Sequence, residues 1–295
     1  MTTPDDLDEE LPTNWGRWGF DDELGTLNFV TDKVRARGAE LVTSGHAVSL
    51  AMPITPVVLA GGGPAPQGLS PMPAPVLQMM TFTGSPALAL TDVLIINTHH
   101  VAMTHIDAVV HIPAESKIYP GIPINEAVRA GTVKHGSTTP LAGGVVTRGI
   151  LLDLAPGGRL APGHPVTGTD FDLAEAREDL RVESGDALVI RGGWTVHKDF
   201  KDGLPGMTVD AVRWMAEREV SLYAGDIGDL PPGNGLPILH KVALARLGMP
   251  LIDGAEVSLL ATTCEELGRY SFLFTLGALP IHGVTGVPVN PLAVF

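Results

Sequence analysis

The chain of 295 residues has a single cysteine, Cys264, so no disulfide can form within it. A lone cysteine fits a reducing compartment, and we expect a cytoplasmic protein in which Cys264 packs without a catalytic role. Basic residues are also scarce, because 19 Lys and Arg stand against 33 Asp and Glu and leave a net charge of −14. This charge repels the phosphates of nucleic acids and anionic lipids, so we expect neither as a partner.

Long hydrophobic runs are missing as well. Gly, Pro or a charged residue interrupts each apolar stretch before it reaches the roughly 20 residues that a membrane span needs. The first ten residues hold five acids without apolar periodicity, so residues 1–12 are expected to form a flexible acidic tail and not a signal peptide. No linker is evident after the tail, and residues 13–295 are expected to form a single domain.

Glycine and proline are abundant, with 35 and 25 residues, and they are spread along the whole chain. Such punctuation is typical of many short strands and loops. Apolar runs predict strands at 87–97, 145–154, 187–191, 221–224 and 271–276. Helical patterns cover 210–218, with Asp210 as a possible cap, then 237–247 before Gly248, and 256–267. Strands alternating with helices predict a mixed α/β (α+β) domain.

One segment departs from this alternation. Residues 52–86 contain Gly61-Gly62-Gly63-Pro64 and Pro71-Met72-Pro73-Ala74-Pro75 and show no periodic pattern. A long irregular segment in a compact domain is usually either functional or disordered. We expect a flap near the active site or plain disorder.

Four of the ten histidines lie within thirteen residues, directly after an apolar strand at 93–97. They are His99, His100, His105 and His111, and Asp107 lies among them. If residues 104–111 are helical, Thr104, Asp107 and His111 share a face; if the chain around His105 is extended, His105 and Asp107 point the same way. Either arrangement brings an imidazole and a carboxylate together.

Imidazole and carboxylate groups suit Zn²⁺ or Mn²⁺ with open positions for water. A single buried histidine is more often a core residue than a ligand, but four histidines and an acid in one cluster favour a functional site. His240, by contrast, follows Leu236-Pro237-Ile238-Leu239 in apolar surroundings and alone would be a core residue.

The segment Thr104-His105-Ile106-Asp107-Ala108, with His111, resembles the hallmark of the cyclase family of metal-dependent hydrolases, which includes kynurenine formamidase and isatin hydrolase. That hallmark is His, three residues, His, one residue, Asp, three residues, His. Further segments resemble those of the longer members, so the similarity extends from Asn14 to Phe295. They are 14–19, 22–28, 147–153 and 283–293.

The resemblance implies a barrel-like mixed sheet flanked by helices, and a homodimer or homotetramer acting on a small molecule. It also implies a divalent metal, Zn²⁺ or Mn²⁺, held by His105, Asp107, His240 and Asp253, with Glu256 as the less well aligned choice for the last ligand. His111 takes the position of the catalytic histidine of the family.

This sequence departs from the hallmark at one position that matters. Val101 stands where the family has its first histidine and cannot bind a metal, and Met103 stands where the family has Gly. His99 or His100 could substitute as ligand or substrate donor, and we favour His99. We therefore place His99, His105 and His111 in the catalytic centre.

The function that follows is a metal-dependent hydrolase that cleaves an amide, lactam or lactone of a small cyclic or aromatic compound. The missing ligand supports an alternative: a biosynthetic cyclase or dehydratase that uses the same histidines with an altered or absent metal site. A noncatalytic binding protein is disfavoured because His105, Asp107 and His111 are all present.

Overall fold

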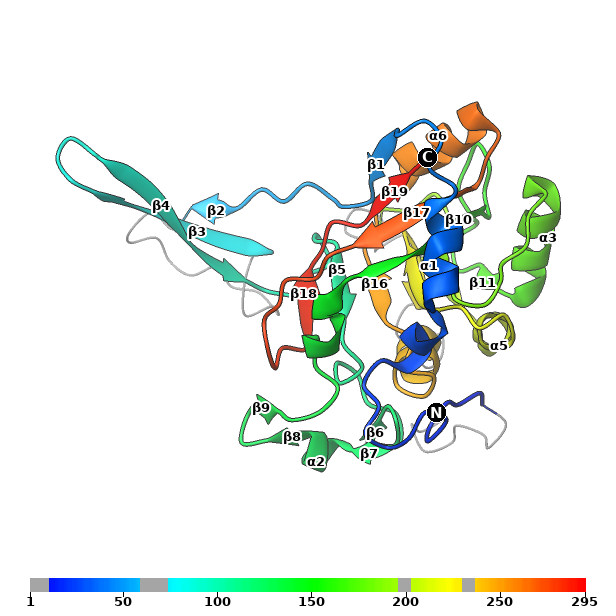
Figure 1. The fold of residues 1–295 in the computed structure, drawn as a ribbon, viewed down its shortest axis with the longest axis horizontal. Helices are drawn as coiled ribbons and strands as arrows, with labels where there is room; N and C mark the ends of the chain where they lie inside the picture. The colour runs from blue at the N-terminus through cyan, green and yellow to red at the C-terminus, as the bar shows by residue number, and fades with distance from the viewer. Residues whose placement is uncertain (1–10, 59–73, 196–202, 230–236) are drawn as a thin grey trace.

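The computed structural model describes residues 11–58, 74–195, 203–229 and 237–295. A curled sheet of nine strands forms its centre (Figure 1), and the four middle strands in the sheet, β10, β12, β14 and β16, run parallel. The other pairings are antiparallel, so the predicted mixed, barrel-like sheet is confirmed. In sheet order the strands are β1 (Ala47–Ser49), β19 (Leu292–Val294), β17 (Ser271–Leu276), β10 (Val145–Asp153), β12 (Ala187–Arg191), β14 (Leu222–Gly225), β16 (Leu251–Asp253), β5 (His105–Asp107) and β18 (Gly286–Pro288).

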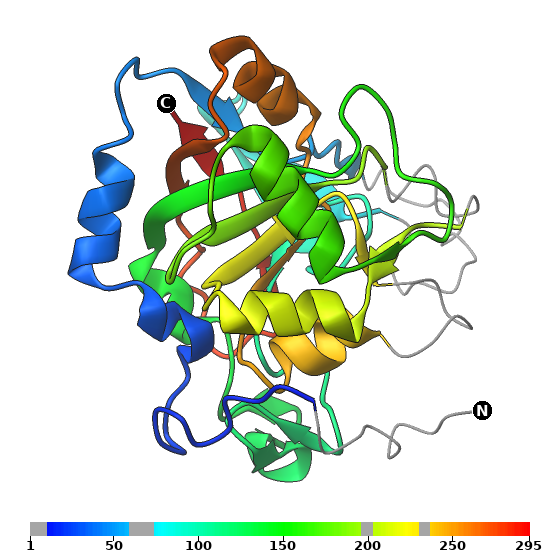
Figure 2. The same ribbon diagram turned by 90° about the vertical axis from the view of Figure 1, so that its right-hand side faces the viewer.

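The parallel strands are buried because helices cover the sheet on both faces (Figure 2). On one face, α3 (Gly168–Glu178), α5 (Val209–Glu217) and η4 (Leu239–Leu244) pack in a core with Ile150 and Leu188. On the other, α6 (Ser258–Leu267) packs with Leu151 and Val189, and α1 (Asp32–Ala39) lies against β10 and β17. Cys264 is buried within α6, and burial raises the pKa of its thiol to about 12, as suits a packing residue.

Two details of the helix predictions were wrong. The cap of α5 is Thr208, whose Oγ1 accepts a hydrogen bond from the Ala211 amide, whereas Asp210 accepts one from the Gly168 amide and so links α5 to the start of α3. The helix expected at 237–247 is a short π-helix, η4, in which the Ala245 amide bonds to the His240 carbonyl. A π turn carries an extra residue per turn and is frequent at functional sites.

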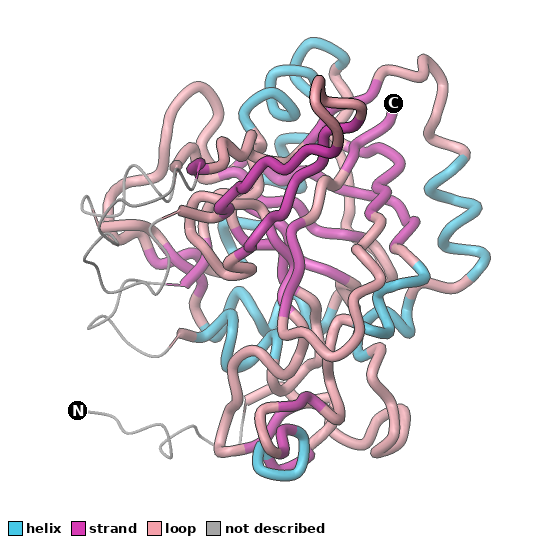
Figure 3. The backbone as a smooth tube through the Cα atoms, turned by 90° about the vertical axis from the view of Figure 1, so that its left-hand side faces the viewer, coloured by secondary structure: helices cyan, strands magenta, loops and turns pink. Residues whose placement is uncertain are grey.

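Away from the body, a long hairpin projects into solvent (Figures 1 and 3). It consists of β3 (Val76–Thr83) and β4 (Ala89–Ile96), and β2 (Val57–Val58) pairs with the base of β3. We call residues 76–96 the arm. The strand predicted at 87–97 is confirmed, but the irregular segment expected to reach residue 86 is wrong for β3, because 76–83 pairs with β4 along its whole length. Residues 59–73 of that segment lie outside the described residues.

The acidic tail predicted at 1–12 lies outside the described residues up to residue 10. Leu11 is buried, and its carbonyl accepts a hydrogen bond from Arg246. Among the helices that the structure describes, none has the length and apolar character needed to cross a bilayer.

Candidate metal centre

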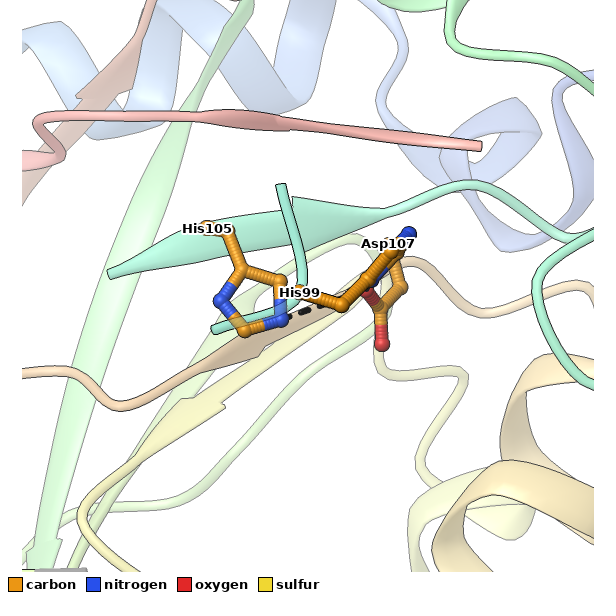
Figure 4. A group of neighbouring side chains, drawn as sticks. All are labelled: His99, His105 and Asp107. Atoms are coloured by element: carbon orange, nitrogen blue, oxygen red, sulfur yellow. Dashed lines mark ion pairs between the residues drawn. The ribbon is translucent and has the colours of Figure 1, made fainter. Parts of the chain in front are cut away.

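Strand β5 carries the centre of the site. It lies between β16 and β18, and its extended backbone places His105 and Asp107 on the same side (Figure 4). The extended alternative is therefore correct and the helical one is wrong. The His105 ring donates from Nδ1 to the Met103 carbonyl at 2.8 Å, which leaves Nε2 facing Asp107 Oδ1 at 3.5 Å.

His99 joins this pair from the loop that follows β4. Its Nδ1 lies 2.8 Å from Asp107 Oδ1, and its Nε2 lies 2.9 Å from the Thr285 hydroxyl. Gly286 is required beside it, because a Cβ there would lie 2.6 Å from His99 Cε1. His99 is therefore part of the cluster, whereas Val101 is 54% exposed and lies outside it. His100 instead accepts a hydrogen bond from the Ala102 amide.

His111 returns to the same carboxylate through a turn, in which its amide bonds to the Ala108 carbonyl. Its ring stacks on that of His99, with centroids 3.6 Å apart and planes 4° apart, and its Nε2 lies 3.9 Å from Asp107 Oδ2. Burial lowers the pKa of His111 to about 4, so the imidazole is neutral at pH 7 and can accept a proton or bind a metal.

The π-helix η4 brings His240 to the opposite side of Asp107. Its Nε2 lies 3.3 Å from Asp107 Oδ2 and 3.3 Å from Asp253 Oδ2, the latter at the end of β16. Burial opposes a charge on His240, but the carboxylates of Asp253, Asp107 and Asp229 raise its pKa well above the ordinary value. Glu256 lies apart from this group and binds the Ser258 amide at the start of α6.

Asp229 is a site residue that the sequence analysis missed. Its Oδ2 lies 2.5 Å from His240 Nδ1, and its Oδ1 accepts the Leu239 amide at 2.5 Å. A carboxylate behind the distal nitrogen fixes the tautomer and orientation of a ligating histidine. The signal was available as an acid shortly after the buried strand 221–224, but no spacing rule joins that position to residue 240.

The polar atoms of this cluster lack conventional partners. Both oxygens of Asp107 and the Nδ1 atom of His99 are buried without a hydrogen bond of acceptable geometry among the described residues. Burial would raise the pKa of Asp107, but the imidazoles of His240, His99, His105 and His111 lower it below the ordinary value, so the carboxylate is ionised. An ionised, buried carboxylate without hydrogen bonds is costly unless a cation meets it.

The donor atoms fit a divalent metal. They form two groups that share Asp107: His99 and His105 on the Oδ1 side, and His111 and His240 on the Oδ2 side. Within each group the candidate ligand atoms lie within 4.8 Å of one another. Ligands at about 2.0–2.2 Å around a tetrahedral zinc lie roughly 3.3 Å apart, which is close to the 3.3–3.9 Å distances from the Asp107 oxygens to His105, His111 and His240.

The structure therefore brings together all the residues predicted for the site: His99, His105, Asp107, His111, His240 and Asp253. Their grouping differs from the expectation in one respect. We expected His105, Asp107 and His240 to share one ion, but His105 and His240 approach different oxygens of Asp107 and belong to different groups.

The model of the Cyclase family matches residues 48–230, which is more than half of the chain and includes His99, β5 and His111. The chain belongs to this family. Its fold is similar to that of a crystal structure described as a novel cyclase, with 27% identity and a TM-score of 0.81 over 97% of this chain and 100% of the other.

Two further structures show the cyclase fold at greater distance. Isatin hydrolase A from Labrenzia aggregata, bound to benzyl benzoate, is 17% identical with a TM-score of 0.59 and covers 84% of this chain and 93% of its own. Isatin hydrolase A from Ralstonia solanacearum is 17% identical with a TM-score of 0.56 and covers 85% and 92%. No curated protein sequence matches the chain. Membership of the Cyclase family supports an enzyme, and the His and Asp cluster offers ligand atoms for a divalent metal.

Proposed function

We propose that this cyclase-family protein is a metal-dependent hydrolase that opens an amide, lactam or lactone bond of a small cyclic or aromatic compound. The observation that carries the proposal is the buried, ionised Asp107 carboxylate, whose oxygens make no hydrogen bond of acceptable geometry with the described residues and face four imidazoles. The fold shared with isatin hydrolases, whose named substrate is an aromatic lactam, supports the bond class.

Metal would be held on either side of Asp107: by His105 on the Oδ1 side, with His99 in place of the histidine missing at Val101, and by His240 on the Oδ2 side, beside Asp253. A bound Zn²⁺ or Mn²⁺ would polarise a carbonyl and lower the pKa of a water from about 15.7 to about 7. Asp107 supplies a charge to both sides of the centre, because its two oxygens face different pairs of histidines. Asp253 adds a second carboxylate beside His240.

The proton transfers belong to His111 in this proposal. Its neutral ring lies beside Asp107 and can accept a proton from the attacking water and return it to the leaving nitrogen or oxygen. The stacking on His99 fixes the plane of the His111 ring, so the transfer needs no reorientation of the imidazole. General acid and base catalysis of this kind contributes roughly a hundred- to ten-thousandfold.

The test uses the full chain, stripped with a chelator and reloaded with Zn²⁺ or Mn²⁺. Metal binding is measured by calorimetry, and hydrolysis is measured on isatin, an N-formyl aniline and an aromatic lactone. We expect binding of metal, and a reaction with at least one substrate that is lost on chelation and restored on reloading. His111→Ala should keep the metal and lose the reaction.

The alternative, a biosynthetic cyclase or dehydratase, is separated by the same measurements. A chain that binds no divalent metal, with an activity that chelation leaves intact, would favour it over hydrolysis. Because His99 lies where the absent histidine was expected to act, we favour the hydrolase.

A further inference from the structure

The ring of His99 has a neighbour at each of its two nitrogens. Its Nδ1 lies 2.8 Å from Asp107 Oδ1, and its Nε2 lies 2.9 Å from the Thr285 hydroxyl, so the ring bridges β5 and the residue that precedes β18. The nitrogen without a proton is the one that can bind a metal, because only that nitrogen has a free lone pair. The neighbours of the two nitrogens therefore decide how His99 acts.

The Asp107 side of the ring is poorly suited to the proton. Nδ1 is buried and makes no hydrogen bond of acceptable geometry with the described residues, although Asp107 Oδ1 is near. A proton on Nδ1 would be a buried donor without an aligned acceptor, which is costly. On Nε2 the proton has Thr285 Oγ1 as its acceptor. The geometry thus favours the tautomer with a protonated Nε2 and a bare Nδ1.

His105 and His240 present the opposite nitrogen to the centre. Each turns Nε2 to Asp107, while its Nδ1 faces an oxygen behind the ring: a backbone carbonyl for His105 and a carboxylate for His240. Such an oxygen fixes which nitrogen of a ligating histidine stays bare. Thr285 has the same place behind His99, with the two nitrogens exchanged.

The backbone holds the Thr285 hydroxyl in a fixed position beside β5. The Thr285 carbonyl accepts a hydrogen bond from the Ala108 amide at 2.9 Å, and the next residue, Gly286, pairs with Asp107 in the sheet. The hydroxyl and the carboxylate that flank the ring are therefore carried by neighbouring segments of one sheet. A ring between them needs no movement of the backbone to keep both contacts.

Ring stacking does not select a nitrogen. The rings of His99 and His111 are 3.6 Å apart with planes 4° apart, and the ring of His105 meets that of His99 edge-on. These contacts fix the plane of the His99 ring. Half a turn of the ring within that plane's constraint would place carbon atoms where the nitrogens lie, and stacking would hardly change. The hydrogen bond to Thr285 distinguishes the two orientations, because a carbon atom cannot replace Nε2 as its donor.

We propose that Thr285 is a positioning residue, which accepts a hydrogen bond from His99 Nε2 and so keeps Nδ1 bare and turned to Asp107. The inference rests on the proposed function, in which His99 is a metal ligand. It adds that this ligand binds through Nδ1, whereas His105 and His240 bind through Nε2. A histidine that enters the centre from position 99 instead of 101 thus reaches the carboxylate with the nitrogen nearer to its own backbone.

The experiment compares Thr285→Val, which removes the hydroxyl at nearly constant shape, with Thr285→Ser, which keeps it. Nitrogen NMR of the full, metal-free chain identifies the protonated nitrogen of His99, whose signals are assigned by their loss in His99→Ala. We expect the proton on Nε2 in the wild type and in Thr285→Ser, and a mixture of tautomers in Thr285→Val. Calorimetry with Zn²⁺ should show an affinity about thirtyfold lower for Thr285→Val and changed by less than about threefold for Thr285→Ser.

The matched control is Thr138→Val. The Thr138 hydroxyl donates to the Ile281 carbonyl, and the Thr138 amide donates to the Val284 carbonyl, so this substitution disturbs the same loop without removing a contact of His99. It should keep the tautomer and the Zn²⁺ affinity of the wild type. Circular dichroism confirms that each variant is folded.

Three results would overturn the proposal: a proton on Nδ1 of His99 in the wild type, an unchanged tautomer in Thr285→Val, or an unchanged Zn²⁺ affinity in that variant. So would a Thr285→Ser variant that behaves like Thr285→Val, since the methyl group would then hold the ring. Failure of the proposed function is read separately. A chain that binds no metal, or hydrolyses none of the substrates, would end that proposal, whereas the tautomer in the metal-free chain still decides the role of Thr285.

Discussion

Strand β5 lies within the central sheet and is at most 5% exposed, yet two of its three side chains are the ionisable His105 and Asp107. The arm lies outside the body, yet many of its exposed side chains are large and apolar, with Leu88 at 85% and Leu90 at 67%. Each region reverses the ordinary relation between burial and polarity. Each reversal costs free energy, and we attribute the one at β5 to a metal ion.

The two regions are close in the sequence as well. Strand β4 of the arm ends at Ile96, and His99 enters the metal centre three residues later. The Asn97 amide bonds to the Pro75 carbonyl and so closes the base of the arm. Contacts that fix the arm therefore also restrict the path of the chain that delivers His99.

We expect the largest effect from removing the charge of Asp107, which tests whether the buried carboxylate binds a metal. Asp107→Asn keeps the shape of the side chain but loses the ionised group that both pairs of histidines approach. We expect metal affinity and any hydrolysis to fall by at least about a thousandfold, or about 4 kcal/mol. Calorimetry and metal analysis check the result, with the exposed Asp172→Asn as control. Full metal occupancy in the Asp107 variant would show that the buried carboxylate serves the fold alone.

Truncating one leucine in the core and one in the arm tests whether the apolar side chains of the arm stabilise the fold. Leu151 is fully buried in the core on the α6 side of the sheet, so Leu151→Ala should lower the free energy of unfolding by about 2–5 kcal/mol. Leu88→Ala should change the free energy of unfolding by less than about 0.5 kcal/mol, because Leu88 is 85% exposed. Urea unfolding of the wild type and of both variants measures the two changes. Equal losses at both positions would mean that the arm packs on its own body.

Substitutions of the neighbouring residues His99 and His100 test which of the two binds the metal, at the junction of the arm and β5. His99→Ala should weaken metal binding by about a hundredfold, because it removes Nδ1 from the Asp107 Oδ1 side. His100→Ala should change it by less than about threefold. Adding Val101→His to the His99 variant should not restore binding, since position 101 is half exposed. A rescue by that histidine would place the first ligand at 101, as in the family hallmark.

The local sequence pattern predicted several of the main elements of this structure. Continuous Val, Ile and Leu runs located β10 and β12, because strands covered on both faces need apolar side chains throughout. The spacing of His105, Asp107 and His111 located the metal centre, because those residues are close along the chain. Strand β3 of the arm was not predicted. It directly follows a stretch rich in proline and glycine, and it does not pack on the body of the protein.

Contacts between segments that are distant in the sequence could not be predicted from residue spacing. His240 was joined to the site by family resemblance, and its π-helical turn does not follow from the apolar pattern of 237–247. The division of the ligands into two groups around Asp107 depends on the register of β5 with β16, which sets His105 opposite Asp253. Asp229 was missed for the same reason, because its link to His240 exists only after β15 (Gly228–Asp229) packs against η4.

We expect the smallest effect on metal binding from a substitution of Asp229, the carboxylate behind His240. Asp229→Asn keeps an oxygen for the Leu239 amide but loses the charge behind His240 Nδ1. We expect metal affinity to fall by about tenfold, because the ring loses the partner that fixes its tautomer while its Nε2 still faces Asp107. Nitrogen NMR of the histidine rings should show a mixture of His240 tautomers in the variant and one form in the metal-loaded wild type. Asp210→Asn, which disturbs a single backbone contact away from the site, is the control. If Asp229→Asn leaves affinity and tautomer unchanged, the geometry of η4 alone orients His240, and the carboxylate serves only to anchor the start of that helix.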